Sequence, residues 1–191
     1  MNKSLFSQYY LDQRLADLPE WSEDLRAEFD AVQTRWQRAR QYGAAWNEAQ
    51  TEDEFVKPLL ERLGWSYIVQ AKANRGGQIS RPDYALFLGE AAKDAAYPFQ
   101  GQDDPFYDRV TVVAEAKRWQ RPLSQKGADQ RDDWKASNNP SHQMVSYLVG
   151  TRVAWGVLTN GAQWRLYSRE VSSTASEYYE IDLFGHRGKE A

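Results

Sequence analysis

Hydrophobic residues recur at helical spacing through the first part of the chain. Between residues 21 and 43 the apolar positions fall near one helical face, and they are Trp21, Leu25, Phe29, Val32 and Trp36. This spacing predicts a helix that Ser22 caps and Gly43 ends. The first fifty residues are therefore predicted to be mostly helical.

A second helix is predicted from about residue 46 to Leu63, with Gly64 at its C-terminal turn. The apolar face of this helix consists of Phe55, Val56, Leu59, Leu60 and Leu63. Pro58 lies inside the stretch. The helix therefore either kinks at this proline or begins late, with Thr51 and Glu54 as a capping box.

From residue 65 onwards the pattern changes to short runs rich in β-branched and aromatic residues. Such runs predict strands in 65–71, 83–88, 109–116 and 176–184. A further pair of strands is predicted within 152–170, on either side of Asn160 and Gly161, because this dipeptide favours a tight hairpin turn.

Two other segments lie between these strands. Residues 89–109 are rich in Gly, Pro, Asp and Ala, which predicts a loop or a hairpin insertion. A helix is predicted after Pro140, with Met144, Tyr147 and Leu148 on one side. The order of elements predicts an α/β fold with a central mixed sheet flanked by helices. Its expected parts are an N-terminal helical segment (1–45), a main domain (46–185) and a tail (186–191).

The amino-acid composition excludes several kinds of functional site. The chain has 191 residues, no cysteine and a formal net charge of −3. The lack of cysteine excludes disulfides, thiol nucleophiles and thiolate zinc sites within this chain, and it is consistent with a cytoplasmic location. No signal peptide, membrane-spanning run or P-loop motif is present in the sequence. We expect a cytoplasmic protein that makes no membrane contact and binds nucleic acid only through a local patch.

Three residues with complementary chemistry stand at the ends of two predicted strands. Asp83 opens the strand in "RPDYALF", while Glu115 and Lys117 close the one in "VVAEAK". If these strands are neighbours, the two carboxylates and the Ala116 carbonyl make an oxygen-only site suited to Mg²⁺. The alternative is a surface aspartate and a Glu–Lys pair at solvated strand ends, since one E-x-K triplet is expected by chance.

An ordered set of five blocks extends this pattern. The blocks are "NEAQTEDEFVKPLLERLGW", "RPDYALF", "VVAEAK", "HQMVSY" and "WGVLTNGAQWRLY". Together they resemble the PD-(D/E)xK nuclease superfamily, and in particular the nuclease domains of type I restriction motor subunits. The resemblance is stronger still to the N-terminal nuclease domains of single-chain type IIG restriction-modification enzymes, which the opening "FSQYYLDQRLADLPEW" also resembles. It covers roughly Phe6 to Tyr167 and implies a restriction-endonuclease-like core.

The resemblance implies roles for individual residues. Asp83 and Glu115 match its metal-binding acids, with Mg²⁺ as the cation and Mn²⁺ as a substitute, and Lys117 matches its catalytic lysine. Gln143 and Tyr147 match a downstream Q-x-x-x-Y element that supports DNA binding or the lysine, and helical spacing places both side chains on one face. The alternative for this pair is an ordinary amphipathic helix.

The resemblance also implies a glutamate on the helix before the first strand. Glu54 projects away from the apolar face, which indicates a capping or solvent-exposed residue. Glu48 and Glu52 fall near the apolar edge, where a side chain could reach the sheet. We expect Glu48 to complete the metal site because it matches the family position, provided that the helix begins before Thr51.

A locally basic segment follows the lysine. Residues 117–135 contain six basic and three acidic residues. The expected contacts to a phosphate backbone are Arg118, Arg121, Lys126 and Lys135, with Trp119 and Trp134 in the same segment. The alternative is a solvated, mobile loop.

These observations favour a Mg²⁺-dependent endonuclease domain that cleaves double-stranded DNA through a metal-activated water. The resemblance implies products with a 5′-phosphate and a 3′-hydroxyl. Its methyltransferase and target-recognition regions would lie in the same, longer chain or in a partner. The alternative is a non-cleaving module that keeps the nuclease fold for binding DNA or protein. Activity on RNA or on branched DNA is a third possibility.

Overall fold

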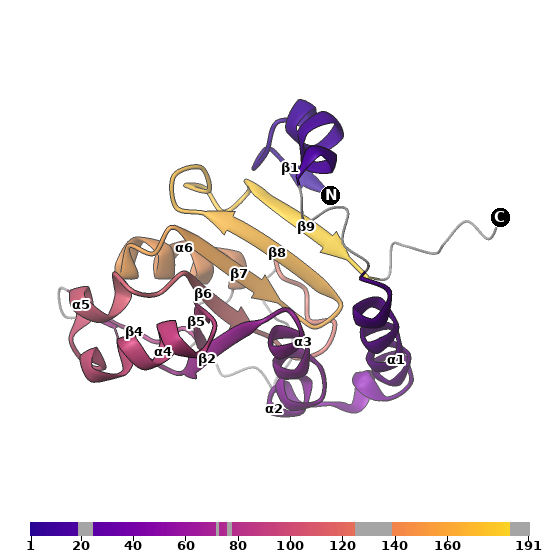
Figure 1. Cartoon of the computed structure of the whole chain (residues 1–191), viewed down its shortest axis with the longest axis horizontal. Helices are drawn as coiled ribbons and strands as arrows, with labels where there is room; N and C mark the ends of the chain where they lie inside the picture. The colour runs from indigo at the N-terminus through magenta and orange to yellow at the C-terminus, as the bar shows by residue number, and fades with distance from the viewer. Residues whose placement is uncertain (19–24, 72, 76–77, 125–138, 184–191) are drawn as a thin grey trace.

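A mixed β-sheet forms the middle of the molecule (Figure 1). The computed structural model describes residues 1–18, 25–71, 73–75, 78–124 and 139–183. In this part of the chain the sheet has seven strands in the order β1-β9-β8-β7-β6-β5-β2. The strands are β1 (Asn2–Lys3), β2 (Trp65–Val69), β5 (Tyr84–Leu88), β6 (Val112–Ala116), β7 (Trp155–Thr159), β8 (Gln163–Ser168) and β9 (Tyr178–Asp182).

One pair of neighbouring strands is parallel. β6 and β7 run in the same direction, whereas the other neighbours in the sheet are antiparallel. Two parallel neighbours need a crossover connection, and α6 (Pro140–Thr151) supplies it over one face of the sheet. The predicted α/β class, with a mixed sheet, flanking helices and an N-terminal helical segment, is confirmed. The arrangement is also compatible with a restriction-endonuclease-like core.

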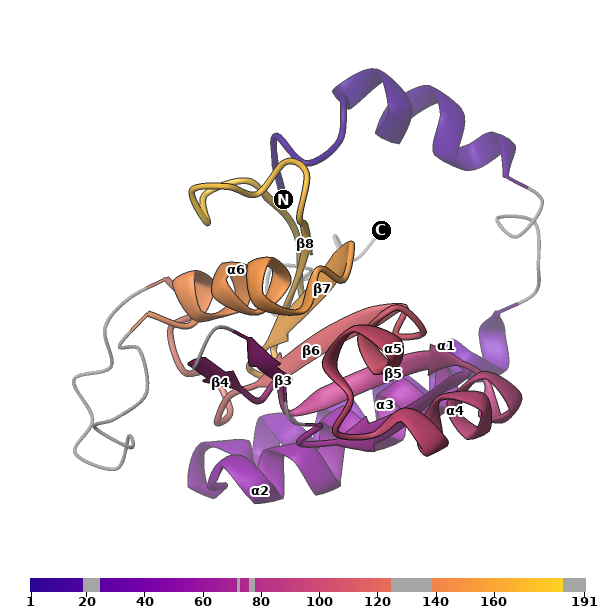
Figure 2. The same ribbon diagram turned by 90° about the vertical axis from the view of Figure 1, so that its left-hand side faces the viewer.

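The sheet separates two hydrophobic cores because side chains alternate along each strand. On one face, Val113 of β6 and Phe87 of β5 pack against Met144 and Leu148 of α6. On the other face, strand residues pack against Val56 and Leu60, and these are Tyr84, Leu86, Val112, Ala114 and Ala116. Figure 2 shows α6 on one side of β5 and β6 and the α2–α3 region on the other. β6 is buried on both faces, as its apolar run predicts.

The helix before β2 is continuous through its proline. It consists of α2 (Glu48–Thr51), a π-helical turn (Glu52–Val56) and α3 (Lys57–Arg62). Pro58 has no N–H and would crowd the carbonyl one turn earlier, and the wide turn before it relieves this conflict. The helix therefore does not begin late, and its irregular turn lies directly before Pro58.

The cap of this helix is not the predicted one. The Asn47 side chain accepts the Gln50 N–H at 2.8 Å, and the Gln50 side chain accepts the Asn47 N–H at 2.9 Å. Glu54 instead pairs with Arg38 of α1 (Arg26–Tyr42), with 3.1 Å between Oε2 and Nε. The expected Thr51–Glu54 capping box is wrong because an earlier asparagine and glutamine already satisfy the first turn.

The segment between β5 and β6 is helical, which corrects the prediction of a loop or hairpin. It contains α4 (Glu90–Ala96), a 3₁₀ turn (Tyr97–Phe99) and α5 (Asp103–Tyr107). Its alanine-rich first half has high helix propensity, which outweighs the turn residues around it. A small hairpin of β3 (Ala73–Arg75) and β4 (Gln78–Ser80) was not predicted either.

Other predicted elements agree with the structure. α1 ends at Gly43 as expected, although it begins only after Leu25, and the predicted Ser22 cap lies outside the described residues. A π-helical turn (Tyr10–Arg14) and a 3₁₀ turn (Leu15–Asp17) precede it, and a further 3₁₀ turn (Gly43–Ala45) follows it. The β7–β8 hairpin turns through Asn160 and Gly161, as predicted. Within the described ranges, no helix combines the length and the hydrophobicity needed to cross a bilayer.

Trp119 holds the N-terminal helices against the end of the sheet. Its ring is 3 % exposed, and its centroid lies 6.0 Å from that of Trp36, 5.8 Å from that of Trp46 and 5.3 Å from that of Phe55. The sequence left Trp119 in a basic segment that either lies along DNA or forms a solvated loop. The Trp119 side chain is instead part of a hydrophobic core, and the alternatives for the rest of the segment stay predictions. Three aromatic neighbours offer this indole more buried contact area than a surface position would.

Two glycines leave the space that Trp119 fills. A Cβ at Gly43 would lie 2.7 Å from the indole, and one at Gly161 would overlap it. Gly161 also has a φ of +78°, which an L side chain rarely adopts. Both glycines are therefore needed for the indole to pack where it does.

We predict that Gly161→Ala destabilises the protein by about 2–4 kcal/mol, because backbone strain adds to overpacking against Trp119. Gly64→Ala is the matched control. Gly64 has a φ of +80° but open space around its missing Cβ, so this variant should lose only about 1 kcal/mol. Urea unfolding of both variants measures the difference. Equal losses would show that Trp119 does not restrict the turn.

Candidate active site

Asp83 and Glu115 meet where β5 begins and β6 ends. The two strands are antiparallel, with Tyr84 opposite Ala114, so the residue before β5 lies beside the last residues of β6. The Asp83 Oδ2 accepts the Ala116 N–H at 2.9 Å, and the Asp83 N–H donates to Glu115 Oε2 at 3.2 Å. Each carboxylate is thus held by the backbone of the other strand.

Lys117 completes a buried group on the same face. Only Ala116 separates it from Glu115, so both side chains project to the same side of the sheet. The Lys117 Nζ lies 2.6 Å from Glu115 Oε1, and the two residues are 4 % and 3 % exposed. The Lys117 N–H donates to the Thr159 carbonyl at 2.7 Å, which continues the β6–β7 pairing past the end of the strand.

Glu48 reaches this group from the first turn of α2. Its Oε2 accepts the Arg118 N–H at 3.2 Å. Its charge also acts on both Glu115 and Lys117. The condition for choosing Glu48, a helix that begins before Thr51, is met.

Glu52 is engaged on the opposite face of the sheet. It accepts a short hydrogen bond from the Tyr84 hydroxyl, and Tyr84 belongs to the core beneath α3. Its charge still acts on Asp83. Between the two glutamates left open by the sequence, Glu48 is the one that contacts the backbone directly after Lys117.

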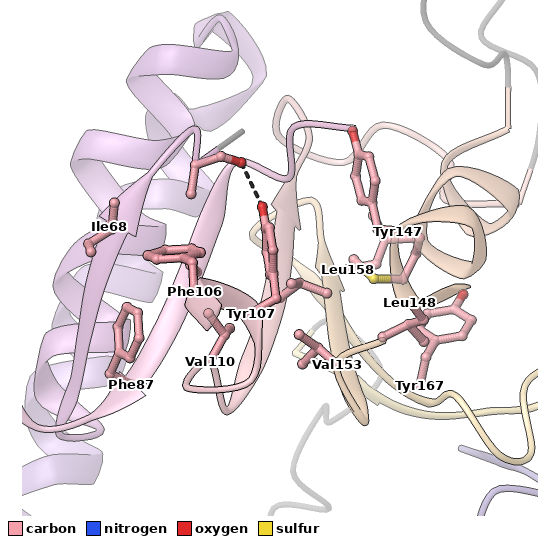
Figure 3. Close-up of a cluster of buried hydrophobic side chains, with 14 of the residues drawn as sticks. Ile68, Phe87, Phe106, Tyr107, Val110, Tyr147, Leu148, Val153, Leu158 and Tyr167 are labelled. Carbon is pink, nitrogen blue, oxygen red and sulfur yellow. Dashed lines mark hydrogen bonds between the residues drawn. The ribbon is translucent and has the colours of Figure 1, made fainter. Parts of the chain in front are cut away.

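Gln143 and Tyr147 of α6 point toward the same group. The Gln143 Nε2 donates to the Tyr147 hydroxyl at 2.7 Å, and this hydroxyl also contacts the Glu115 carboxylate. Figure 3 shows the Tyr147 hydroxyl at the end of the hydrophobic cluster away from Val110 and Val153, which precede β6 and β7. The Gln143 Oε1 is buried without a hydrogen-bond partner. The helix is amphipathic, and its polar pair nevertheless faces the carboxylates.

The charges in the site are unbalanced. Burial first, and then the neighbouring Glu115, raise the pKa of Asp83 to about 8. Burial also raises the pKa of Glu115. Burial disfavours the charged form of Lys117, but the surrounding carboxylates, Glu115 foremost, outweigh it and raise the pKa. At neutral pH the site therefore holds a protonated lysine and an excess of acidic groups.

Two of the four predicted phosphate contacts lie in the described part of the chain. Arg118 is half-buried, and Arg121 is buried, with 6 % of its surface exposed. Lys126, Lys135 and Trp134 lie outside the described residues. The structure therefore brings Arg118 next to Lys117 but leaves the extent of the basic segment as a prediction.

Sequence reasoning missed the role of the residues that fix the segment after Lys117. The Thr51 hydroxyl accepts the Trp119 N–H at 3.0 Å. The Asn160 carbonyl accepts the Gln120 N–H at 3.1 Å, and the Asn160 Nδ2 donates to the Arg121 carbonyl at 2.7 Å. The Asn-Gly dipeptide predicted a tight turn at this position. It did not predict that Asn160 would also bind the backbone of Gln120 and Arg121.

The carboxylate oxygens of the site suit a hard cation, but they would not surround it completely. Among the residues described, no three His, Asp or Glu side chains gather into a metal-binding cluster. Two carboxylates converge, and Lys117 occupies one oxygen of the second. Mg²⁺ is commonly bound by one or two carboxylates, with water and phosphate oxygens completing its shell. The residues present fit this open type of site.

Searches against protein-family models, curated proteins and solved structures found no match for this chain. The chemistry of the site is therefore inferred from its geometry, its charges and the motif resemblance.

We predict that Asp83→Asn stabilises the protein at pH 9 but not at pH 4. The folded state holds the Asp83 proton up to about pH 8, and the unfolded state releases it near pH 3.8. Wild-type stability should thus fall as the pH rises between these values, and the neutral amide removes this loss. For a chain of this size, each kcal/mol that the substitution adds to the free energy of unfolding at pH 9 should raise Tm by about 2–4 °C.

Thermal unfolding at several pH values provides the test. Asp94→Asn, at an exposed position of α4, is the control and should not change the pH profile. A stability difference between Asp83→Asn and wild type that is the same at all pH values would contradict the assignment of the proton to Asp83.

Proposed function

We propose that this chain is a Mg²⁺-dependent DNA endonuclease domain of the restriction-modification type, acting on double-stranded DNA in the cytoplasm. One observation carries the proposal: Asp83, Glu115 and Lys117 converge on one face at the shared end of two strands. This combination supplies oxygen ligands for a cation beside a fixed positive charge, and both would stabilise the negative charge that develops during phosphodiester hydrolysis. The ordered motif blocks described above support the same reaction.

The residues that would hold the cation are Asp83, Glu115, the Ala116 carbonyl and Glu48. When bound, Mg²⁺ or Mn²⁺ supplies an activated water and stabilises negative charge on the phosphate. The raised pKa of Asp83 supports this assignment, because a site with surplus carboxylates and no cation retains a proton instead.

Lys117 acts in this proposal as a charged donor and not as a base. Its pKa is raised, so the ammonium persists at neutral pH and can donate hydrogen bonds to a phosphate oxygen or to water. Tyr147 contacts Glu115, and Gln143 holds Tyr147. These two residues orient the carboxylate, while Arg118, and the basic segment beyond it, contact the DNA backbone.

The further parts of such an enzyme lie elsewhere. Methyltransferase and target-recognition regions would belong to the same, longer chain or to a partner. The second candidate is a non-cleaving module that uses this fold to bind DNA or protein. It is favoured by the engagement of Glu115 Oε1 with Lys117 and by the lack of a cluster of three acids among the described residues.

We predict that Lys117→Met and Asp83→Asn each lower the rate of plasmid cleavage at least about a hundredfold, as expected for loss of one group that stabilises the transition state. Both variants should keep the circular dichroism spectrum and cooperative unfolding of the wild type. Lys57→Met is the matched control, since Lys57 pairs with Asp53 on the helix surface. A wild type that cleaves with neither Mg²⁺ nor Mn²⁺ would favour the non-cleaving module.

We predict that Mn²⁺ binding at pH 7 releases close to one proton, because Asp83 is protonated below its pKa of about 8 and must ionise to bind a cation. Affinity should therefore rise with pH, by up to about tenfold per unit, and level off above pH 8. Calorimetry in two buffers with different ionisation enthalpies measures the proton count. An enthalpy independent of the buffer would contradict this coupling, and Asp83→Asn should bind weakly at every pH.

A further inference from the structure

A cavity lies at the same end of the sheet as Asp83. It has a volume of about 320 Å³ and lies between the end of β2 and the helical segment that joins β5 to β6. Its lining residues are Val69, Gln70, Ala71, Gln100, Gly101 and Phe106. The proposed reaction above uses neither this cavity nor the helical segment that builds one of its walls.

A backbone hydrogen bond connects the lining of the cavity to the candidate active site. The Gln70 N–H donates to the Asp83 carbonyl at 2.8 Å, so the two residues are paired across β2 and β5. Phe106 belongs to the core on the face that carries Glu115 and Lys117. The cavity therefore shares both its sheet edge and its face with the two carboxylates.

The helical segment is fixed to this position. The Tyr107 hydroxyl donates to the Ala71 carbonyl at 2.7 Å, the bond drawn in Figure 3 beside Phe106. Phe106 is 1 % exposed and Tyr107 3 %. Because α5 is anchored in the core, the wall formed by Gln100 and Gly101 is held in place and the cavity is preformed.

The lining chemistry selects the kind of ligand. None of the described residues around the cavity carries a charge, so this part of the lining favours a neutral group over a phosphate. Two exposed glutamines instead offer amide groups above an apolar floor. A glutamine amide presents a donor and an acceptor side by side, which matches the edge of a nucleobase.

Gln70 adopts a backbone conformation that is costly for its residue type. Its φ is +49°, in the left-handed region that glycine favours. Such strain is concentrated at binding and catalytic sites, where it fixes the direction of a side chain. Here it sets the direction of the residue that links the cavity to Asp83.

We propose that this cavity binds a nucleobase unstacked from the DNA next to the scissile phosphate, with Gln70 and Gln100 contacting its edge. The proposal rests on the proposed nuclease function. Extruding a base requires its unpairing and unstacking, which is least costly at mismatched positions. The helical segment between β5 and β6 thereby gains a function: it gives the site a base preference beside the cut.

The test is a selection of bound DNA from a randomised duplex pool, with Ca²⁺ in place of Mg²⁺. The wild type should enrich one base at one position, roughly five- to a hundredfold, as expected for an amide contacting a base edge. Gln70→Gly removes the amide but suits the left-handed backbone, so it should fold, retain most DNA binding and lose the enrichment. Ser4→Gly is the matched control, because Ser4 has a φ of +63° and does not line the cavity.

Each outcome bears on the proposal. Enrichment by the wild type and by Ser4→Gly, but not by Gln70→Gly, supports the base site. A mismatch at the enriched position should then raise wild-type affinity and leave that of Gln70→Gly unchanged. A wild type without positional preference, or a Gln70→Gly pool that equals the wild-type pool, would overturn it. A Gln70-dependent preference in a chain that cuts no DNA would retain the base site and refute the nuclease function.

Discussion

The antiparallel register of β5 against β6 is the constraint on which the candidate site depends. It pairs Tyr84 with Ala114 and so places Asp83 beside the last residues of β6. The reciprocal bonds between Asp83, Glu115 and the backbone of the opposite strand are possible only in this register. A shift by one residue would turn Asp83 toward the α3 side and bury Tyr84 and Leu86 on the wrong face. The two hydrophobic cores and the acidic site are thus set by the same pairing.

That register brings several carboxylates close together at a buried position, where their mutual repulsion is unfavourable for folding. Asp83, Glu115 and Glu48 surround a single lysine at the end of buried strands. Backbone N–H groups and Lys117 offset part of the repulsion, and a proton on Asp83 offsets more, as its raised pKa indicates. A purely structural strand end would be more stable with neutral residues. Retaining carboxylates at this position is more easily understood if a cation and a phosphate share the site during function.

The sequence predicted those features that depend on local pattern. Strand positions and the hairpin at Asn160 followed from residue type and period, as did the shared face of Gln143 and Tyr147. The pairing of β5 with β6 did not follow from them and was only a condition of the expected metal site. Features that depend on tertiary contact were missed or misjudged: the π-helical turn before Pro58, the burial of Trp119 and the helices between β5 and β6. In these places the alternative conformations are locally similar in energy, and packing against distant segments decides between them. The motif resemblance, rather than periodicity, singled out Glu48 over Glu52.

The packing of Trp119 has a consequence for how this chain can vary. The indole fills space left by two glycines from separate elements, Gly43 after α1 and Gly161 in the β7–β8 turn. Only Arg118 separates Trp119 from Lys117, and the backbone N–H of Trp119 donates to the Thr51 hydroxyl. A larger side chain at either glycine would require a smaller one at 119, and such an exchange would displace the backbone that carries the lysine. In homologous chains these three positions should therefore change together or not at all, and the N-terminal helices should be inherited as one unit with the sheet.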